Sequence, residues 1–76
     1  MHDNVKAKLE ELSIRPTLAL DDDEASDGGK ILRWAAVDDT GEPMTIELYN
    51  DGFLDIWYIR PREGERESVY SEWVLI

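Results

Sequence analysis

Two short glycine turns place the strongest constraint on how this chain can fold, because the length of a hairpin loop decides which residues face each other across two strands. The first turn, Asn50-Asp51-Gly52, fits a three-residue loop with its glycine in the left-handed conformation. This loop sets Leu48 opposite Leu54, whereas a two-residue loop would set Leu48 against Asp55. The longer loop also creates two further apolar pairs: Ile46 with Ile56 and Met44 with Tyr58. We therefore predict the three-residue register.

The second turn, Asp39-Thr40-Gly41, independently predicts the same apolar face. Treated as a three-residue loop, it sets Ala36 opposite Met44 and leaves Arg33 opposite Glu47 on the other face. Two separate turns thus favour one arrangement of three strands. The predicted core face consists of Leu32, Trp34, Ala36, Met44, Ile46, Leu48, Leu54, Ile56 and Tyr58.

A helix over residues 3–13 is predicted to cover that face. It has apolar residues at helical spacing: Val5, Leu9 and Leu12. Asp3 or Asn4 can cap its first exposed amides, and Pro16 is expected to end it, because proline cannot continue a helix. The apolar side of this helix is the natural partner of the core face.

We therefore predict one α+β domain over residues 1–76, in which the N-terminal helix packs on one face of an antiparallel β-meander. The meander occupies residues 30–76 and has four strands, or five if residues 17–21 join as an edge strand. Residues 22–29 are expected to form a polar, acidic loop that ends in two glycines.

The third hairpin has an open register. A Glu63-Gly64 turn would pair Arg60 with Glu67 and would bring Trp57 next to Tyr70. The sequence does not choose between this register and its neighbours.

Composition narrows the class of protein. The chain contains no cysteine, so it has neither disulfides nor thiolate metal ligands, and small secreted domains usually depend on such cross-links. Its longest wholly apolar stretches are four residues, far short of the ~20 that cross a bilayer. We expect a cytoplasmic protein without a membrane segment or signal peptide.

The net charge of −10, from 8 basic and 18 acidic residues, disfavours direct binding to nucleic acid or to anionic lipid. Charged partners should therefore be basic. The lysine-poor, acid-rich composition is also similar to that of proteins from salt-accumulating halophiles, where salt screens dense carboxylates. Under that halophilic interpretation the acidity reflects habitat rather than function.

Catalytic and metal sites are not predicted. The acidic loop does not fit the spacing of an EF-hand, because Ala25 and Trp34 fall where oxygen ligands belong. His2 is the single histidine and lies near the N-terminus. The predicted helix and strands therefore contain no histidine that could act as a general base for a serine. Glu47 and Asp55 should be cross-strand neighbours, but Arg33 flanks Glu47, which favours a ladder of surface charges over a catalytic dyad. We expect neither an enzyme nor a cofactor.

The sheet face away from the helix carries the candidate functional residues, because aromatic side chains on such a face are typical of protein interfaces. The predicted binding residues are Tyr49, Phe53, Trp57, Ile59, Arg33, Glu47 and Asp55, with Tyr70 as a further aromatic candidate. The leading hypothesis is a non-catalytic binding or adaptor module that docks a protein partner or forms a homodimer through this face.

The alternative hypothesis is a nucleic-acid mimic that occupies the basic groove of a DNA- or RNA-binding protein. The overall charge is similar to that of anti-restriction and anti-CRISPR proteins, although the resemblance is one of composition alone. The carboxylates that would imitate phosphates are those of Asp38, Asp39, Glu42, Glu47, Asp51 and Asp55.

Overall fold

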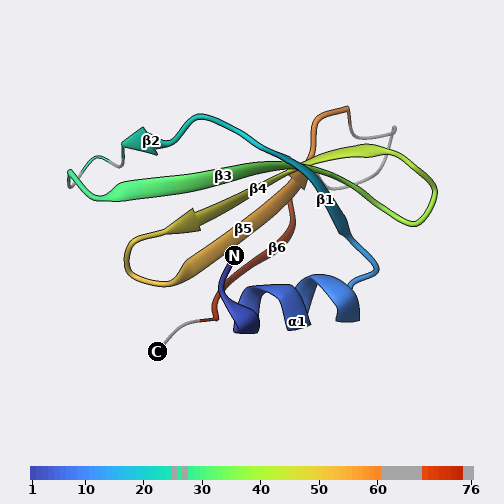
Figure 1. Ribbon diagram of the computed structural model, residues 1–76, viewed down its shortest axis with the longest axis horizontal. Helices are drawn as coiled ribbons and strands as arrows, with labels where there is room; N and C mark the ends of the chain where they lie inside the picture. Colours follow the sequence, from blue (N-terminus) through green and yellow to red (C-terminus); the bar gives the residue numbers. More distant parts are fainter. Residues whose placement is uncertain (25, 27, 61–67, 75–76) are drawn as a thin grey trace.

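The computed structural model describes residues 1–24, 26, 28–60 and 68–74, which form one helix and one antiparallel sheet (Figure 1). The elements in chain order are α1 (Asp3–Glu11), β1 (Arg15–Ala19), β2 (Asp23–Glu24), β3 (Lys30–Val37), β4 (Pro43–Tyr49), β5 (Phe53–Tyr58) and β6 (Ser68–Trp73). The strand order is β1-β3-β4-β5-β6, and the two-residue β2 also pairs with β3. The predicted α+β class with an N-terminal helix and an antiparallel sheet is confirmed, but the sheet has six strands rather than four or five.

Both predicted glycine-turn registers are confirmed. Leu48 pairs with Leu54 across the β4–β5 hairpin, and Ala36 pairs with Met44 across the β3–β4 hairpin. Gly41 and Gly52 have φ angles of 87° and 91°, in the region that favours glycine. Hydrophobic pairing and turn chemistry therefore select the same register, as the sequence indicates.

The helix ends earlier than predicted, at Glu11, and Pro16 does not end it. Ser13 adopts a left-handed φ of 59°, and the N–H of Ile14 donates to the carbonyl of Leu9 at 2.9 Å. This is a Schellman ending, which satisfies the last helical carbonyls and turns the chain back toward the sheet. The edge strand therefore begins at Arg15, two residues before the predicted 17–21 strand, and it ends at Ala19.

The start of α1 also differs from the prediction. The N-cap is His2, whose Nδ1 accepts a hydrogen bond from the N–H of Asn4 at 3.1 Å, so neither Asp3 nor Asn4 serves as the cap. An imidazole nitrogen can satisfy an exposed helical amide in the same way as the usual short polar side chains. The single histidine thus has a structural contact.

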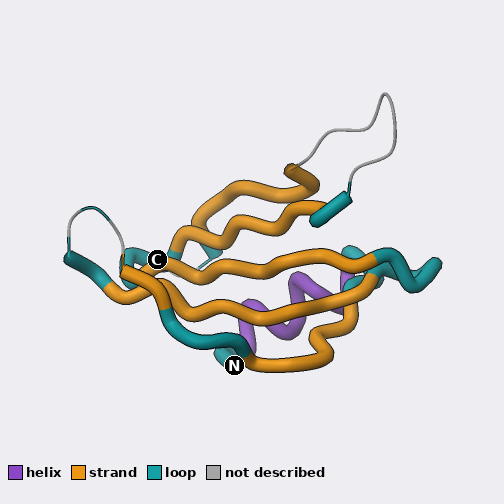
Figure 2. The backbone as a smooth tube through the Cα atoms, turned by 90° about the horizontal axis from the view of Figure 1, so that it is seen from above, coloured by secondary structure: helices purple, strands orange, loops and turns teal. Residues whose placement is uncertain are grey.

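In Figures 1 and 2, α1 lies against one face of the sheet, and the hydrophobic core packs between the two. Its buried members are Val5, Leu9, Ile14, Ala36, Met44, Ile46, Leu48, Leu54 and Ile56. Ile14 was not predicted to be part of it. Leu32 was predicted to be in it but is 36% exposed, because a nine-residue helix is only about 14 Å long and one helix cannot cover five strands spaced about 4.8 Å apart. No helix among the described residues is long and apolar enough to cross a membrane.

The last hairpin shows why its register could not be predicted. Residues 61–67 lie outside the described residues. They include the Glu63-Gly64 turn and Glu67, the partner that this turn would give to Arg60. In β6, Tyr70 pairs with Ile56, and Trp57 pairs with Ser68, with an irregularity between them. Tyr70 is therefore a partly buried neighbour of the core, and the proposed contact of Trp57 with Tyr70 is wrong.

Gly41 offers a test of the β3–β4 turn. A Cβ atom at this position would meet no other atom within 4 Å, so any cost of Gly41→Ala comes from its positive φ alone. We expect Gly41→Ala to lower the free energy of unfolding by about 1 kcal/mol, measured by urea denaturation. Gly41→Asn is the control and should cost less, because asparagine tolerates this conformation. Equal stability of the alanine variant and the parent protein would contradict the assigned turn.

Candidate functional site

The sheet face opposite α1 carries most of the predicted binding residues. We call it the open face, since none of the described helices or strands covers it. Cross-strand pairing places its members side by side: Arg33, Thr45, Glu47, Tyr49, Phe53, Asp55, Trp57, Ser71 and Trp73. Most of these side chains are neither fully buried nor fully exposed. The face therefore combines apolar and charged groups at partial burial.

One end of the open face holds a row of aromatic rings. The rings of Tyr49 and Phe53 meet edge to face, with centroids 5.9 Å apart, and Phe53 meets Trp73 in the same manner at 4.7 Å. The Trp73 side chain is 62% exposed, and its indole N–H donates to the carboxylate of Asp51 at 3.4 Å. Such edge-to-face pairs hold the rings in defined orientations. The row thus presents a preformed aromatic surface.

Trp73 is the member of the row that was not predicted from the sequence. Because the register of the last hairpin is open in the sequence, no face can be predicted for Trp73. The alternation of Trp73 with Ser71 would have placed both on one face, but which face depends on the irregular pairing of β5 with β6. Ile59, one of the predicted binding residues, follows the end of β5 and is 54% exposed.

The centre of the open face holds an ion pair that is partly withdrawn from water. The Nε of Arg33 lies 3.2 Å from a carboxylate oxygen of Glu47, with 34% and 13% of the two side chains exposed. The N–H of this Nε does not aim at a hydrogen-bond acceptor, so the contact is electrostatic. Burial raises the pKa of Glu47 above its ordinary value, and attraction to Arg33 opposes that rise. The predicted charge ladder is present, and it includes Asp55, which pairs with Glu47.

Asp55 is surrounded by hydroxyl groups. Its Oδ1 accepts hydrogen bonds from Ser71 Oγ at 2.6 Å and Ser68 Oγ at 3.2 Å, and the two serine oxygens are 2.8 Å apart. A cavity of about 320 Å³ adjoins this network and is lined by Glu47, Asp55, Trp57 and Ser68. The chemistry present is that of hydrogen-bond acceptors and negative charge beside an indole ring, which suits a cationic group.

The carboxylates proposed as phosphate mimics do not form one row. Asp38 belongs to the β3–β4 turn, where its side chain accepts hydrogen bonds from Thr40, from the N–H of Glu42 and from the hydroxyl of Tyr58. These bonds, led by that of the Thr40 hydroxyl, hold the pKa of Asp38 well below its ordinary range. The Asp38 carboxylate therefore stabilises the turn through these hydrogen bonds.

The acidic loop differs from the prediction in that part of it is ordered as a strand. Asp23 and Glu24 form β2 and pair with Ile31 and Lys30 of β3, and Asp22 forms an ion pair with Lys30 at 2.8 Å. Among the residues that the structure describes, no three side chains of the metal-ligating types come together.

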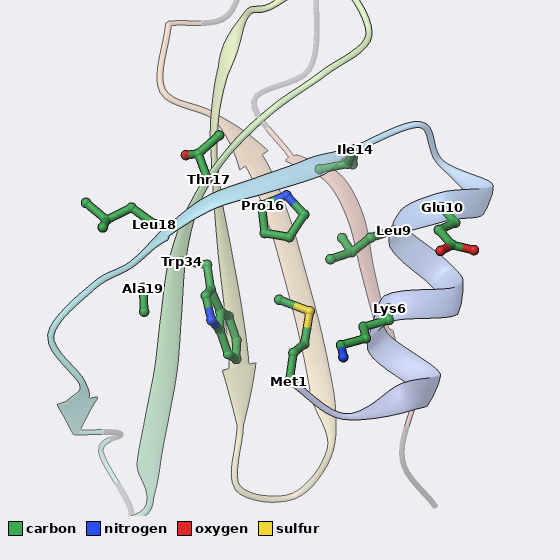
Figure 3. Close-up of a pocket in the computed structure, with 10 residues that line it drawn as sticks. All are labelled: Met1, Lys6, Leu9, Glu10, Ile14, Pro16, Thr17, Leu18, Ala19 and Trp34. Carbon is green, nitrogen blue, oxygen red and sulfur yellow. The ribbon is translucent and has the colours of Figure 1, made fainter.

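A second concavity lies on the helix side of the sheet, between α1, β1 and β3 (Figure 3). It has a volume of about 480 Å³, and its lining residues are Met1, Lys6, Leu9, Glu10, Ile14, Pro16, Thr17, Leu18, Ala19 and Trp34. In Figure 3 the indole of Trp34 runs along the sheet with Met1 between it and α1, while Leu18 points away. This cavity marks the part of the core face that α1 leaves uncovered, and it was not predicted from the sequence.

Comparisons of the chain with protein-family models, with curated proteins and with solved structures found no match.

Proposed function

We propose that this chain is a non-catalytic binding module that docks a basic protein surface on its open face. The observation that supports this proposal is the row of Tyr49, Phe53 and Trp73, which presents aromatic rings beside carboxylates on a face that no described element covers. Aromatic side chains supply large contact areas at low conformational cost and dominate the energetics of many interfaces.

Charge favours a basic partner over a second copy of the chain. Asp51, Glu47 and Asp55 accompany the aromatic rings, and Arg33 is the cation placed among them by the described strands. A homodimer through this face would bring together two chains that each carry a net charge of −10. Opposite charges accelerate association and suppress wrong partners, whereas like charges oppose it. A lysine- or arginine-bearing protein therefore fits the face better.

Trp57 provides the test, because it lies beside Asp55 on the open face and is half-buried. In an affinity capture from native lysate at low and high salt, we expect Trp57→Asp to reduce retention of a basic protein about tenfold or more, as for an interface hot spot. The control is Ala7→Asp, which adds the same charge at an exposed position of α1. Retention by Trp57→Asp equal to that by Ala7→Asp would refute the proposed face.

Nucleic-acid mimicry is the second candidate, and the net charge of −10 is the observation that favours it. Asp39 and Glu42 at the β3–β4 turn and Asp51 at the β4–β5 turn would supply the negative charge at opposite ends of β4. In the same capture, this function predicts a nucleic-acid-binding protein that high salt or added DNA releases and that binds the Trp57→Asp variant unchanged.

A further inference from the structure

The two edges of the sheet differ in how well they are protected against the addition of another strand. The β1 edge contains Pro16, which has no N–H to offer, and its pairing with β3 is irregular between Pro16 and Leu18. The opposite edge is β6, which contains neither proline nor lysine. Its one irregularity lies at its start, between Ser68 and Tyr70, and its pairing is regular from Tyr70 to Trp73. Proline, lysine and irregular pairing are the usual means of preventing strand addition. Among the described strands, β6 is therefore the edge open to a further strand.

The pairing with β5 shows which backbone groups of β6 face outward. The N–H of Val74 donates to the carbonyl of Gly52 at 3.0 Å, so this pair is hydrogen-bonded. Backbone groups alternate in direction along an antiparallel strand, so Glu72 also faces β5, while Ser71 and Trp73 direct their N–H and C=O groups away from it. No described strand lies beyond β6 to receive these groups.

The side chains beside this edge have a distinct chemistry. Trp73 is the most exposed aromatic ring of the open face. The hydrogen-bond donors that the structure shows at Asp51 and Asp55 are neutral: backbone N–H, indole N–H and serine hydroxyl groups. Carboxylates without a cationic partner, next to an exposed indole, are suited to lysine or arginine through charge-assisted hydrogen bonds and cation–π contact.

We propose that β6 accepts an extended, basic segment of a protein partner as an additional strand of the sheet. The segment pairs its backbone with Ser71 and Trp73, and every second side chain, lysine or arginine, lies over the open face near Asp55 and the Trp73 indole. This inference rests on the proposed function and specifies its partner as a strand rather than a folded surface. A second copy of β6 fits less well, because it would bring a further net charge of −10 to the same edge.

The probe is the peptide acetyl-Lys-Val-Arg-Val-Lys-Val-Arg-amide, titrated into isotope-labelled protein and followed by NMR and amide hydrogen exchange. We expect the amides of Ser71 and Trp73 to exchange fast in the free protein and at least about fivefold more slowly with saturating peptide, since each gains a hydrogen bond. The amide of Glu72, already bonded within the sheet, should change little.

Ser71→Pro and Ser71→Ala form a matched pair of variants. Both lose the serine hydroxyl that donates to Asp55, but only proline removes the outward N–H. We expect Ser71→Pro to weaken peptide binding about fivefold or more relative to Ser71→Ala. A peptide with N-methyl groups on alternate backbone nitrogens should bind the unmodified protein as poorly as the unmethylated peptide binds Ser71→Pro. This measurement does not depend on the folding of a variant.

The outcomes separate this inference from the proposed function. Equal binding of the methylated and unmethylated peptides, or no binding of either, overturns strand addition, while the Trp57→Asp capture still decides whether the open face is an interface. Protection of the Ser71 amide that rises with protein concentration in the absence of peptide would show that a second copy occupies the edge, which also overturns it.

Discussion

Ile56→Ala is expected to lower the free energy of unfolding by about 3 to 4 kcal/mol, the largest effect that we predict for this protein. The side chain has no exposed surface and packs in the core beneath α1, so its loss removes buried apolar area and leaves a cavity that the surrounding strands cannot readily close. A domain of this length has a total stability of only about 4 to 11 kcal/mol. The substitution should therefore remove a large share of the total stability.

Ile59→Ala is the matched control, because it removes the same atoms three residues further along the chain. Ile59 is 54% exposed and should cost less than about 1 kcal/mol. Urea denaturation monitored by tryptophan fluorescence measures both variants. Similar losses for the two variants would mean that the core does not lie between α1 and the Ile56 face of the sheet.

Arg33→Met is expected to lower the free energy of unfolding by about 1 to 2 kcal/mol at pH 7. The substitution keeps much of the apolar side chain but removes the cation 3.2 Å from the Glu47 carboxylate, which is left largely desolvated. This estimate is smaller than the cost of breaking a fully buried pair, about 3 to 5 kcal/mol, because about one third of Arg33 is exposed and solvent screens part of the attraction.

The effect of Arg33→Met should depend on pH in a defined direction. Burial raises the pKa of Glu47 in the folded protein above its ordinary value of 4.5, so the folded state binds more protons than the unfolded state between these two pKa values. The contribution of Glu47 to stability therefore falls as pH rises through that interval. Without Arg33, the pKa of Glu47 in the folded protein rises further. The difference in free energy of unfolding between Arg33→Met and the parent should therefore shrink as pH falls and disappear below about pH 4.5, where Glu47 is protonated in both states.

A double variant, Arg33→Met with Glu47→Leu, tests the cause. Replacing both charges with apolar groups removes the uncompensated carboxylate, so the stability should recover to near that of the parent and lose the pH dependence assigned to this pair. Urea denaturation at pH 7 and at pH 4.5 would measure it. A double variant that is as unstable as Arg33→Met would show that the arginine acts through packing rather than charge.

The predictable part of the fold came from local chemistry. Gly41 and Gly52 require particular turns, and the alternation of apolar residues in the flanking strands agrees with only one register for each, so two hairpins and one core face followed directly. The same alternation placed Phe53, Asp55 and Trp57 together on the opposite face, because side chains in a strand point alternately to its two faces.

The candidate site was predicted only as far as this alternation extends. Tyr49 and Phe53 were placed correctly, and Arg33 meets Glu47 as expected. Trp73 could not be placed, because the irregular pairing near Trp57 shifts β6 by one residue, and a shift of one residue exchanges the two faces of a strand. The same shift moved Tyr70 to the core side.

The sequence by itself determined the class of the fold, the two glycine turns and the two faces of β3, β4 and β5, since turn geometry and side-chain alternation act between near neighbours. Only the tertiary structure decided which strand lies at each edge of the described sheet, where Trp73 joins Phe53, and how much of the core face α1 covers. These features depend on contacts between segments far apart in the chain, and no local pattern specifies such contacts.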